Sequence, residues 1–557
     1  MVKKNNRKIN KPDTPAVPTQ TEGQENAAPP QTVLKKGFLA DKIVQTPANG
    51  GKKNKKCRIC LNMIVKDEEE IILGCLKNVC HLLLPDENGE GEGCIAILDT
   101  GSSDRTVKII NNFMLKNGIK GEVMVKQFSD FGVSRTEALR YGEDVCFRIS
   151  KGLLGPAGQC LTDYKPPPPK RWKPRFITEM LTLEEFLKHP KAPDSKSRDL
   201  TKYDGAQFLE ERLAEHKNSD LGDDRWYLMF MDADNELRVK SWDPNCKEVY
   251  QVDKEKMIDE TYSTQMKQGP ISYKYCAMVK VNREKPWIWN KKIHEHVVPC
   301  KWENPKRGQL VNCYILSGRS GARSKDPCKY LKDAVICERE VLADPNDEHY
   351  VFYGSQSYRD FGSLEQSMKW YLKRATMKGW TEQVYISYLE AGKLQMRLDD
   401  KNLFKALPNL LRGFQETPNR LEAPFFILQV YLQLGLPRVG WEFAKPLLDV
   451  KTPDDLLFID TSIHNWQFFQ VSAASAHQAN DFAAAVPVAE KALSAPDIPK
   501  EVAAGLINMI NDAKSKIPPA APLKPADKEK KEKIKKENKV EIIEASDKLE
   551  TEKNNCN

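Results

Sequence analysis

The chain has 557 residues, of which 40% are hydrophobic, and a formal net charge of +8. This length allows roughly two to four domains with cores of their own. No apolar run reaches the roughly 20 residues of a membrane-spanning helix, and the first residues carry charge without the apolar segment of a signal peptide. The 14 cysteines are irregularly spaced, which favours reduced thiols over a disulfide framework. We therefore expect a soluble, cytoplasmic protein.

The positive charge is concentrated at the N-terminus. Residues 1–56 hold 12 Lys and Arg against 4 Asp and Glu, so the remaining residues hold 74 of each sign. This basic arm is rich in Pro, Gln and Asn and lacks hydrophobic periodicity, so we expect it to be disordered. Because the rest of the chain is neutral, nucleic-acid binding is not expected, and the arm is interpreted as a solubilising tail. The alternative is an arm that contacts RNA or an acidic surface.

Residues 57–342 alternate between strand and helix patterns. Strands are predicted at 58–65, 94–99, 121–128 and 226–234, and helices at 67–79, 103–118 and 134–142. The first helix has Asp67 as its expected N-cap with Glu70 three residues later. This alternation predicts a mostly parallel sheet covered on both faces. Ligands bind such sheets beyond the carboxyl ends of the strands, where Asp99, Asp232 and Asp234 fall.

The stretch CRICLNMIVKDEEE (57–70) can be read as half a zinc site or as the first strand of that sheet. In a strand, Cys57 and Cys60 point to opposite faces. The later candidates, Cys75 and Cys80, lie about 140° apart around a helix. A zinc site is therefore disfavoured, and the stretch is interpreted as a strand that brings Lys66 and Glu68 to a ligand.

Asp232 and Asp234 form a D-x-D pair after the apolar run WYLMFM. Two carboxylates at the end of a buried strand are costly unless a positive group is nearby. A hard divalent cation bound to phosphates satisfies that need. The alternative is a solvated pair in an ordinary turn. Likewise, the turn DTGSSDRT after Asp99 suits a base, a ribose or a phosphate, or is a simple connection between strand and helix.

Residues 343–516 show helical patterns almost throughout, with breaks at 361–362, 434–437 and 480–481. This all-α region resembles tetratricopeptide repeats and predicts a helical solenoid. Residues 143–222 fit neither pattern and are interpreted as an insertion that contains the proline-rich run KPPPPKRWKPR (165–175). Residues 517–557 alternate in charge and are interpreted as a solvated helix or a disordered tail.

Five motifs in order, MIVKDEEEIILGCL, LDTGSSDRTVKII, FSDFGVSRTEAL, WYLMFMDADNEL and IHEHV, resemble the family-two nucleotide-sugar glycosyltransferases. These enzymes have a GT-A fold, with a Rossmann-like mixed sheet. The resemblance is strongest to the subgroup fused to tetratricopeptide-like repeats, and it covers about residues 58–142 and 223–395. It implies an α/β GT-A domain followed by an all-α solenoid.

The resemblance also implies roles for individual residues. Asp99 would read the base or the ribose, together with Val65, Lys66 and Glu68. Arg135 would face the diphosphate or the base. Asp232 and Asp234 would hold Mn²⁺ or Mg²⁺ against the diphosphate.

Two further segments would complete this site. In WIWNKKIHEHV, either His294 completes the metal shell or Glu295 takes the proton of the acceptor hydroxyl, and Glu295 is narrowly preferred as the base. The alternative is a structural His-Glu pair at a domain edge. Arg323 lies in a Gly- and Ser-rich segment that is suited to closing over phosphates, or that is a flexible surface loop.

The implied function is an inverting, metal-dependent glycosyltransferase whose donor is a nucleotide-diphospho sugar. The helical repeats would bind a protein or glycan acceptor or a partner protein. The alternative is a non-catalytic adaptor with a decayed glycosyltransferase domain. A nucleotidyltransferase is disfavoured, because KDEEE stands where such enzymes carry a basic phosphate loop. The long insertions leave the sugar and the acceptor undetermined.

Overall fold

The computed structural model describes residues 56–85, 92–161, 204–239, 252, 254, 256–377 and 379–518. These residues all belong to one compact unit, 55–557. Nearly all of the predicted N-terminal arm and C-terminal tail, and the whole proline-rich run, lie outside the described residues. No helix in the described part of the chain combines the length and the apolar character needed to cross a membrane.

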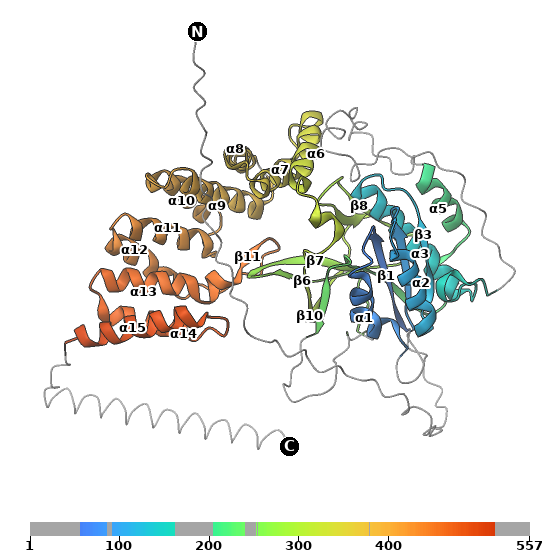
Figure 1. Ribbon diagram of the computed structural model, residues 1–557, viewed down its shortest axis with the longest axis horizontal. Coiled ribbons are helices and arrows are strands. Elements are labelled where there is room, and N and C mark those ends of the chain that lie inside the picture. Colours follow the sequence, from blue (N-terminus) through green and yellow to red (C-terminus); the bar gives the residue numbers. More distant parts are fainter. Residues whose placement is uncertain are drawn as a thin grey trace, which may run out of the picture. The chain divides into compact units, whose positions relative to one another are not determined.

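Four parallel strands form one half of the main sheet, in the order β3-β2-β1-β4. Their bounds are β1 Cys57–Val65, β2 Cys94–Asp99, β3 Lys120–Val125 and β4 Arg225–Phe230. The helices among them are α1 Ile72–Leu83, α2 Thr106–Asn117, α3 Phe131–Ser150 and α5 Asp204–Ala214. The predicted alternation of strands and helices is confirmed in this half (Figure 1).

The other half of the sheet is mixed. This confirms the mixed sheet that the family resemblance implies, whereas the pattern-based prediction of a mostly parallel sheet is wrong there. The order continues from β4 through β7 (Ile271–Lys280), β6 (Thr261–Gln268) and β10 (Arg307–Leu316) to β5 (Glu236–Val239). β7 is antiparallel to both β4 and β6. The reason is a tight turn at Gly269, where φ is +57°, because two strands joined by a short hairpin must run in opposite directions. Strands β8 (Trp287–Asn290) and β9 (His296–Pro299) form a separate hairpin.

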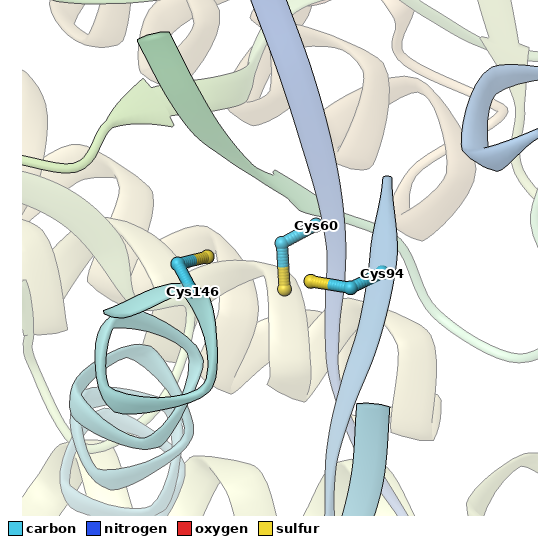
Figure 2. A group of neighbouring side chains, drawn as sticks. All are labelled: Cys60, Cys94 and Cys146. Carbon is cyan, nitrogen blue, oxygen red and sulfur yellow. The ribbon is translucent and has the colours of Figure 1, made fainter. Parts of the chain in front are cut away.

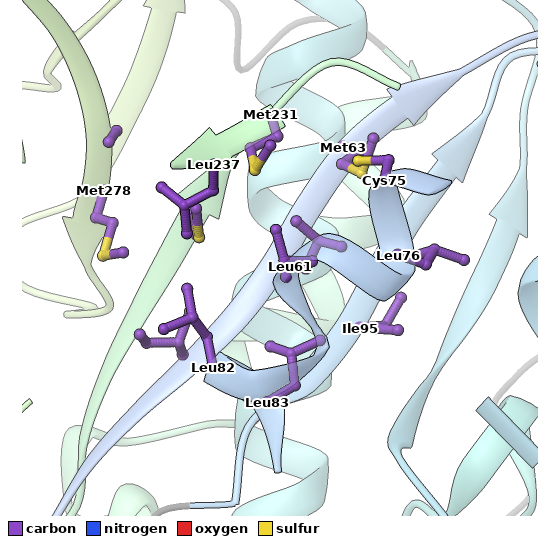
Figure 3. Packing of buried hydrophobic residues seen from close by; sticks show 14 of the residues in the cluster. Leu61, Met63, Cys75, Leu76, Leu82, Leu83, Ile95, Met231, Leu237 and Met278 are labelled. Carbon is purple, nitrogen blue, oxygen red and sulfur yellow. The ribbon is translucent and has the colours of Figure 1, made fainter. Parts of the chain in front are cut away.

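Both faces of the parallel half are buried, and β1 shows this within one strand. Leu61 and Met63 face α1, where they pack with Leu76 and Leu82 (Figure 3). On the opposite face, Cys60 belongs to the core that α3 covers. The alternation of side chains along a strand therefore divides β1 between two cores, which is why its sequence is apolar at almost every position.

Several predicted boundaries differ from the structure, among them the strand ends predicted at 128 and 234, which lie at Val125 and Phe230. Helix α1 starts at Ile72 rather than at 67, and Asp67, with φ of +52°, does not cap it. Its carboxylate instead accepts a hydrogen bond from the Ser103 N–H at 2.7 Å. Helix α3 continues to Ser150, so residues 143–150 belong to the core helix and not to the predicted insertion. Arg148 and Asp144 form a buried ion pair there, at 2.8 Å.

The C-terminal half of the described chain is helical, as predicted. The helices are α6 Lys329–Ala343, α7 Glu348–Phe361, α8 Leu364–Thr376, α9 Thr381–Leu398, α10 Leu407–Glu416, α11 Glu422–Gln433, α12 Pro437–Ala444, α13 Phe468–Gln478, α14 Phe482–Leu493 and α15 Lys500–Lys516. Consecutive helices contact each other, as α12 to α15 do in Figure 1. The three predicted breaks are confirmed, since α7 ends before Gly362, with φ of +97°, and the others separate α11 from α12 and α13 from α14. A short strand, β11 (Ile459–Asp460), pairs with β7 of the sheet.

Candidate active site

A cavity of about 2150 Å³ lies beyond the carboxyl ends of β1 and β4. Lys66 and Glu68 follow β1, and Asp232 and Asp234 follow β4; all four line the cavity. Because β1 and β4 are parallel neighbours, their following segments emerge at the same edge of the sheet. The predicted position of the site is thus also where the described residues form a large cavity.

Arg135 of α3 joins two of the predicted site residues. Its Nη2 lies 2.6 Å from Asp232 Oδ1, and its Nε lies 2.6 Å from Glu295 Oε1. Burial opposes the positive charge of Arg135, but these two carboxylates outweigh burial and raise its pKa. The guanidinium also lies 5.2 Å from the centre of the Trp289 ring. Arg135 therefore fixes the relative positions of the D-x-D segment and the proposed base.

A short segment, residues 317–326, lies against the other two carboxylates. The Gly321 N–H donates to Asp234 Oδ2 at 3.1 Å, and the Ala322 N–H donates to Glu68 at 3.2 Å. A Cβ added to Gly318 would come 2.0 Å from the Asp234 carbonyl oxygen. Only glycine at 318 permits this close approach of the segment to the D-x-D turn.

Glu68 has an unusual protonation equilibrium. Its pKa is raised from 4.5 to about 7, mainly by burial and, despite the Ala322 N–H, also by the negative charges of Asp234 and Asp232. Oxygen donors that repel one another suit a hard cation such as Mg²⁺ or Mn²⁺. In donor chemistry, the two aspartates and their surroundings therefore fit the implied metal.

His294 is not brought together with the two aspartates as a metal site. Its ring stacks on Tyr353 of α7, with centroids 4.1 Å apart. Burial, with His349, Arg323 and Lys329 nearby, lowers its pKa to about 3, so the imidazole is neutral. Within the described residues, only Cys60, Cys94 and Cys146 form a group of three possible ligands whose donor atoms all lie within 4.8 Å of one another. The predicted set of Asp232, Asp234 and His294 is thus not assembled.

Asp99 and Val65 take different places in the site. Asp99 is 1% exposed, and its Oδ2 accepts from the Gly101 and Ser102 N–H groups at 3.1 and 3.0 Å. Its other oxygen accepts from the Ser102 hydroxyl. The carboxylate thus stabilises the turn after β2 and does not line the cavity, whereas the nearly buried Val65 does. The role of Asp99 toward a base or a ribose stays a prediction.

Arg323 is held by α6, which the sequence had not linked to the site. It donates to the nearly buried Asp333 and lies 4.7 Å from the Phe131 ring centre. Asp333 and Tyr353 both line the cavity. Arg323 and Asp333 stand ten residues apart in the segment ARSKDPCKYLKDA. A helix predicted to start after residue 328 would place Asp333 near its first turn, and this was the sequence signal that could have suggested the pair.

No family model and no curated protein matches the chain. Among solved structures, the chain is similar to the MamA protein, with 16% identity and a TM-score of 0.24 over 35% of this chain and 89% of that one. It is also similar to YrrB, a TPR protein with an unusual peptide-binding site, with 15% identity and a TM-score of 0.25 over 32% and 84% of the two chains. It is also similar to TTC0263, a thermophilic TPR protein in Thermus thermophilus, with 14% identity and a TM-score of 0.24 over 33% of this chain and 91% of that one.

Proposed function

We propose that the protein is a glycosyltransferase that transfers a sugar from a nucleotide-diphospho sugar to an acceptor hydroxyl. The observation that carries this proposal is the bridge from Asp232 through Arg135 to Glu295, at the carboxyl edge of the parallel strands. It holds a D-x-D carboxylate and a possible base at one cavity. The family resemblance of the motifs supports the same reading.

One set of side chains would bind the diphosphate of the sugar donor. Asp232 and Asp234 would hold Mg²⁺ or Mn²⁺, which when bound neutralises the charge of the leaving diphosphate. Arg323, kept in place by Asp333, would contact the phosphates, since guanidinium groups bind phosphate oxygens with two parallel hydrogen bonds. Lys66 lines the same cavity and adds a positive charge.

Glu295 would act as the base, on a reaction that inverts the sugar carbon. The acceptor oxygen forms a bond to that carbon, the bond from the carbon to the diphosphate oxygen breaks, and the hydroxyl proton passes to Glu295. Arg135 orients this carboxylate through the Nε contact. Orientation matters because general-base catalysis requires the carboxylate within hydrogen-bonding reach of the proton that it accepts.

The helical region would bind the acceptor or a partner protein. Side chains of α7, α9 and α11 line the same cavity as the D-x-D pair, among them Arg359, Gln383 and Phe426. Arg359 already donates to Glu390, and Gln383 accepts from Arg374, so an acceptor would meet these polar groups together with their partners and with the Phe426 ring. An acceptor held there would have access to the sugar donor without leaving the cavity.

The test is donor binding and turnover with UDP-, GDP- and CMP-sugars, each with and without Mn²⁺. We expect one donor to raise the melting temperature only when the metal is present, and Asp234→Asn to abolish donor hydrolysis and transfer while the fold stays intact. Asp400→Asn, at an exposed turn of the helical region, is the matched control and should retain activity. If no donor binds with metal, or if Asp234→Asn turns over normally, the non-catalytic adaptor is the better reading.

A further inference from the structure

Three buried cysteines from three different elements lie close together on the face of the sheet that α3 covers. Cys60 in β1 and Cys94 in β2 are direct register partners on neighbouring parallel strands, so their side chains point to the same face. Cys146 comes from α3, which covers that face. The three sulfur atoms lie within 4.8 Å of one another, and Figure 2 shows them turned toward one point.

The surroundings exclude most other donors. All three cysteines are 0% exposed, and they share a core with Ala96 and Leu228. A buried amide, Asn62, lies on the same strand face, but its Nδ2 donates to the carbonyls of Ala96 and Ala138 at 3.1 and 2.7 Å. In the described residues, no His, Asp or Glu joins the three thiols in this group. The donor set is therefore three sulfurs.

We propose that Cys60, Cys94 and Cys146 form a three-coordinate site for a soft, thiophilic cation, namely Cu(I). Thiolate sulfur selects soft ions over the hard cations that carboxylates prefer. Structural zinc almost always takes four ligands, and the fourth ligand is missing from the described group. This site is separate from the proposed glycosyltransferase site and does not depend on its function.

The spacing of the sulfurs suits this coordination. A metal–sulfur bond of about 2.3 Å places three sulfurs in a trigonal plane roughly 4 Å apart. The sulfurs already lie within 4.8 Å of one another, so each pair needs to close by less than about 1 Å, which side-chain rotation can supply. Because the site is closed to solvent, we expect the ion to bind as the chain folds, as in other metal-coupled folding.

The experiment uses the full-length chain, refolded without oxygen in the presence of one equivalent of Cu(I), or of Zn(II) as the comparison ion. We expect one copper per chain to survive desalting against a Cu(I) chelator, with near-ultraviolet sulfur-to-copper absorption and a higher melting temperature. Zn(II) should be lost under the same treatment. Retention of zinc in place of copper, or loss of both, would overturn the proposal.

Variants then locate the site. Cys146→Ser should lose the tightly held copper, whereas Cys337→Ser, which alters an equally buried cysteine of α6 outside the group, should retain it. If Cys146→Ser does not fold, X-ray absorption of the copper-loaded wild-type protein decides the question. Three sulfur neighbours at about 2.3 Å would support the site; two sulfurs, or nitrogen and oxygen neighbours, would refute it, as would equal copper loss in both variants.

Discussion

Replacing Glu68 by Gln should make the protein more stable at high pH. The carboxyl is half-buried, and its pKa rises from 4.5 to about 7 because of burial and because Asp234 and Asp232 are close. The folded state therefore binds the proton more tightly than the unfolded state does. The stability that this proton brings is complete below pH 4.5 and is lost as the pH rises through 7. Glutamine is neutral at every pH and keeps an oxygen for the Ala322 N–H.

The size of the effect follows from the pKa change. At 1.36 kcal/mol for each pKa unit, the rise corresponds to about 3 kcal/mol, and solvent screening of a half-buried group reduces it to about 1–2 kcal/mol. At pH 8 we expect Glu68→Gln to melt about 2–5 °C above the wild type. The difference should shrink to less than about a third of that value at pH 5, where the wild-type carboxyl is protonated in the folded state.

The assay is thermal unfolding of the full chain at pH 5 and pH 8, with EDTA present so that no divalent cation occupies the cavity. Glu70→Gln is the matched control, because the Glu70 side chain is 73% exposed and pairs with Lys325 at the surface, at 2.8 Å. Such pairs contribute about 1 kcal/mol at most. The reasoning is refuted if Glu68→Gln is less stable than the wild type at pH 8, or if its advantage is the same at both pH values.

Three other substitutions test the packing around the site and in the helical region, each by chemical denaturation. Arg135→Ala should lower the free energy of unfolding by about 2–3 kcal/mol, because it leaves the nearly buried Glu295 carboxylate unpaired. Its control is Arg105→Ala, which removes a 75% exposed side chain and should cost less than about 1 kcal/mol. Similar losses in the two variants would contradict the bridge from Asp232 through Arg135 to Glu295. Leu410→Ala, fully buried in α10, should cost about 2–5 kcal/mol, and its 40% exposed neighbour, in Leu411→Ala, less than about 1 kcal/mol; the reverse order would mean that the helix faces the other way. Gly121→Ala should cost about 2 kcal/mol or more, because φ is +133° and the new Cβ would lie 1.9 Å from a carbonyl oxygen of the adjacent strand; an unchanged denaturation midpoint would argue against this register.

Local patterns in the sequence were sufficient for the parallel half of the sheet and for the helix breaks. Hydrophobic periodicity and glycine positions act within one element, so β1, β2 and the stop before Gly362 could be predicted from neighbouring residues alone. The same reasoning misplaced the start of α1. The Asp67 carboxylate accepts a hydrogen bond from Ser103, 36 residues away, instead of capping the N-terminus of α1. Hydrophobic patterns also missed the mixed half of the sheet, where the hairpin between β6 and β7 sets the strand direction; only the family resemblance implied a mixed sheet.

By itself, the sequence determined which residue types stand at the carboxyl ends of β1 and β4, and it predicts a ligand site there. Only the tertiary structure decided which of them meet. Arg135 reaches Asp232 and Glu295 across 97 and 160 residues of chain. The stretch CRICLNMIV shows the same division, because its pattern disfavoured a site of Cys57 with Cys60 and carried no information on the approach of Cys60 to cysteines of β2 and α3. The physical reason is that side-chain periodicity gives the face on which a residue lies, whereas strand register and helix packing give its partners.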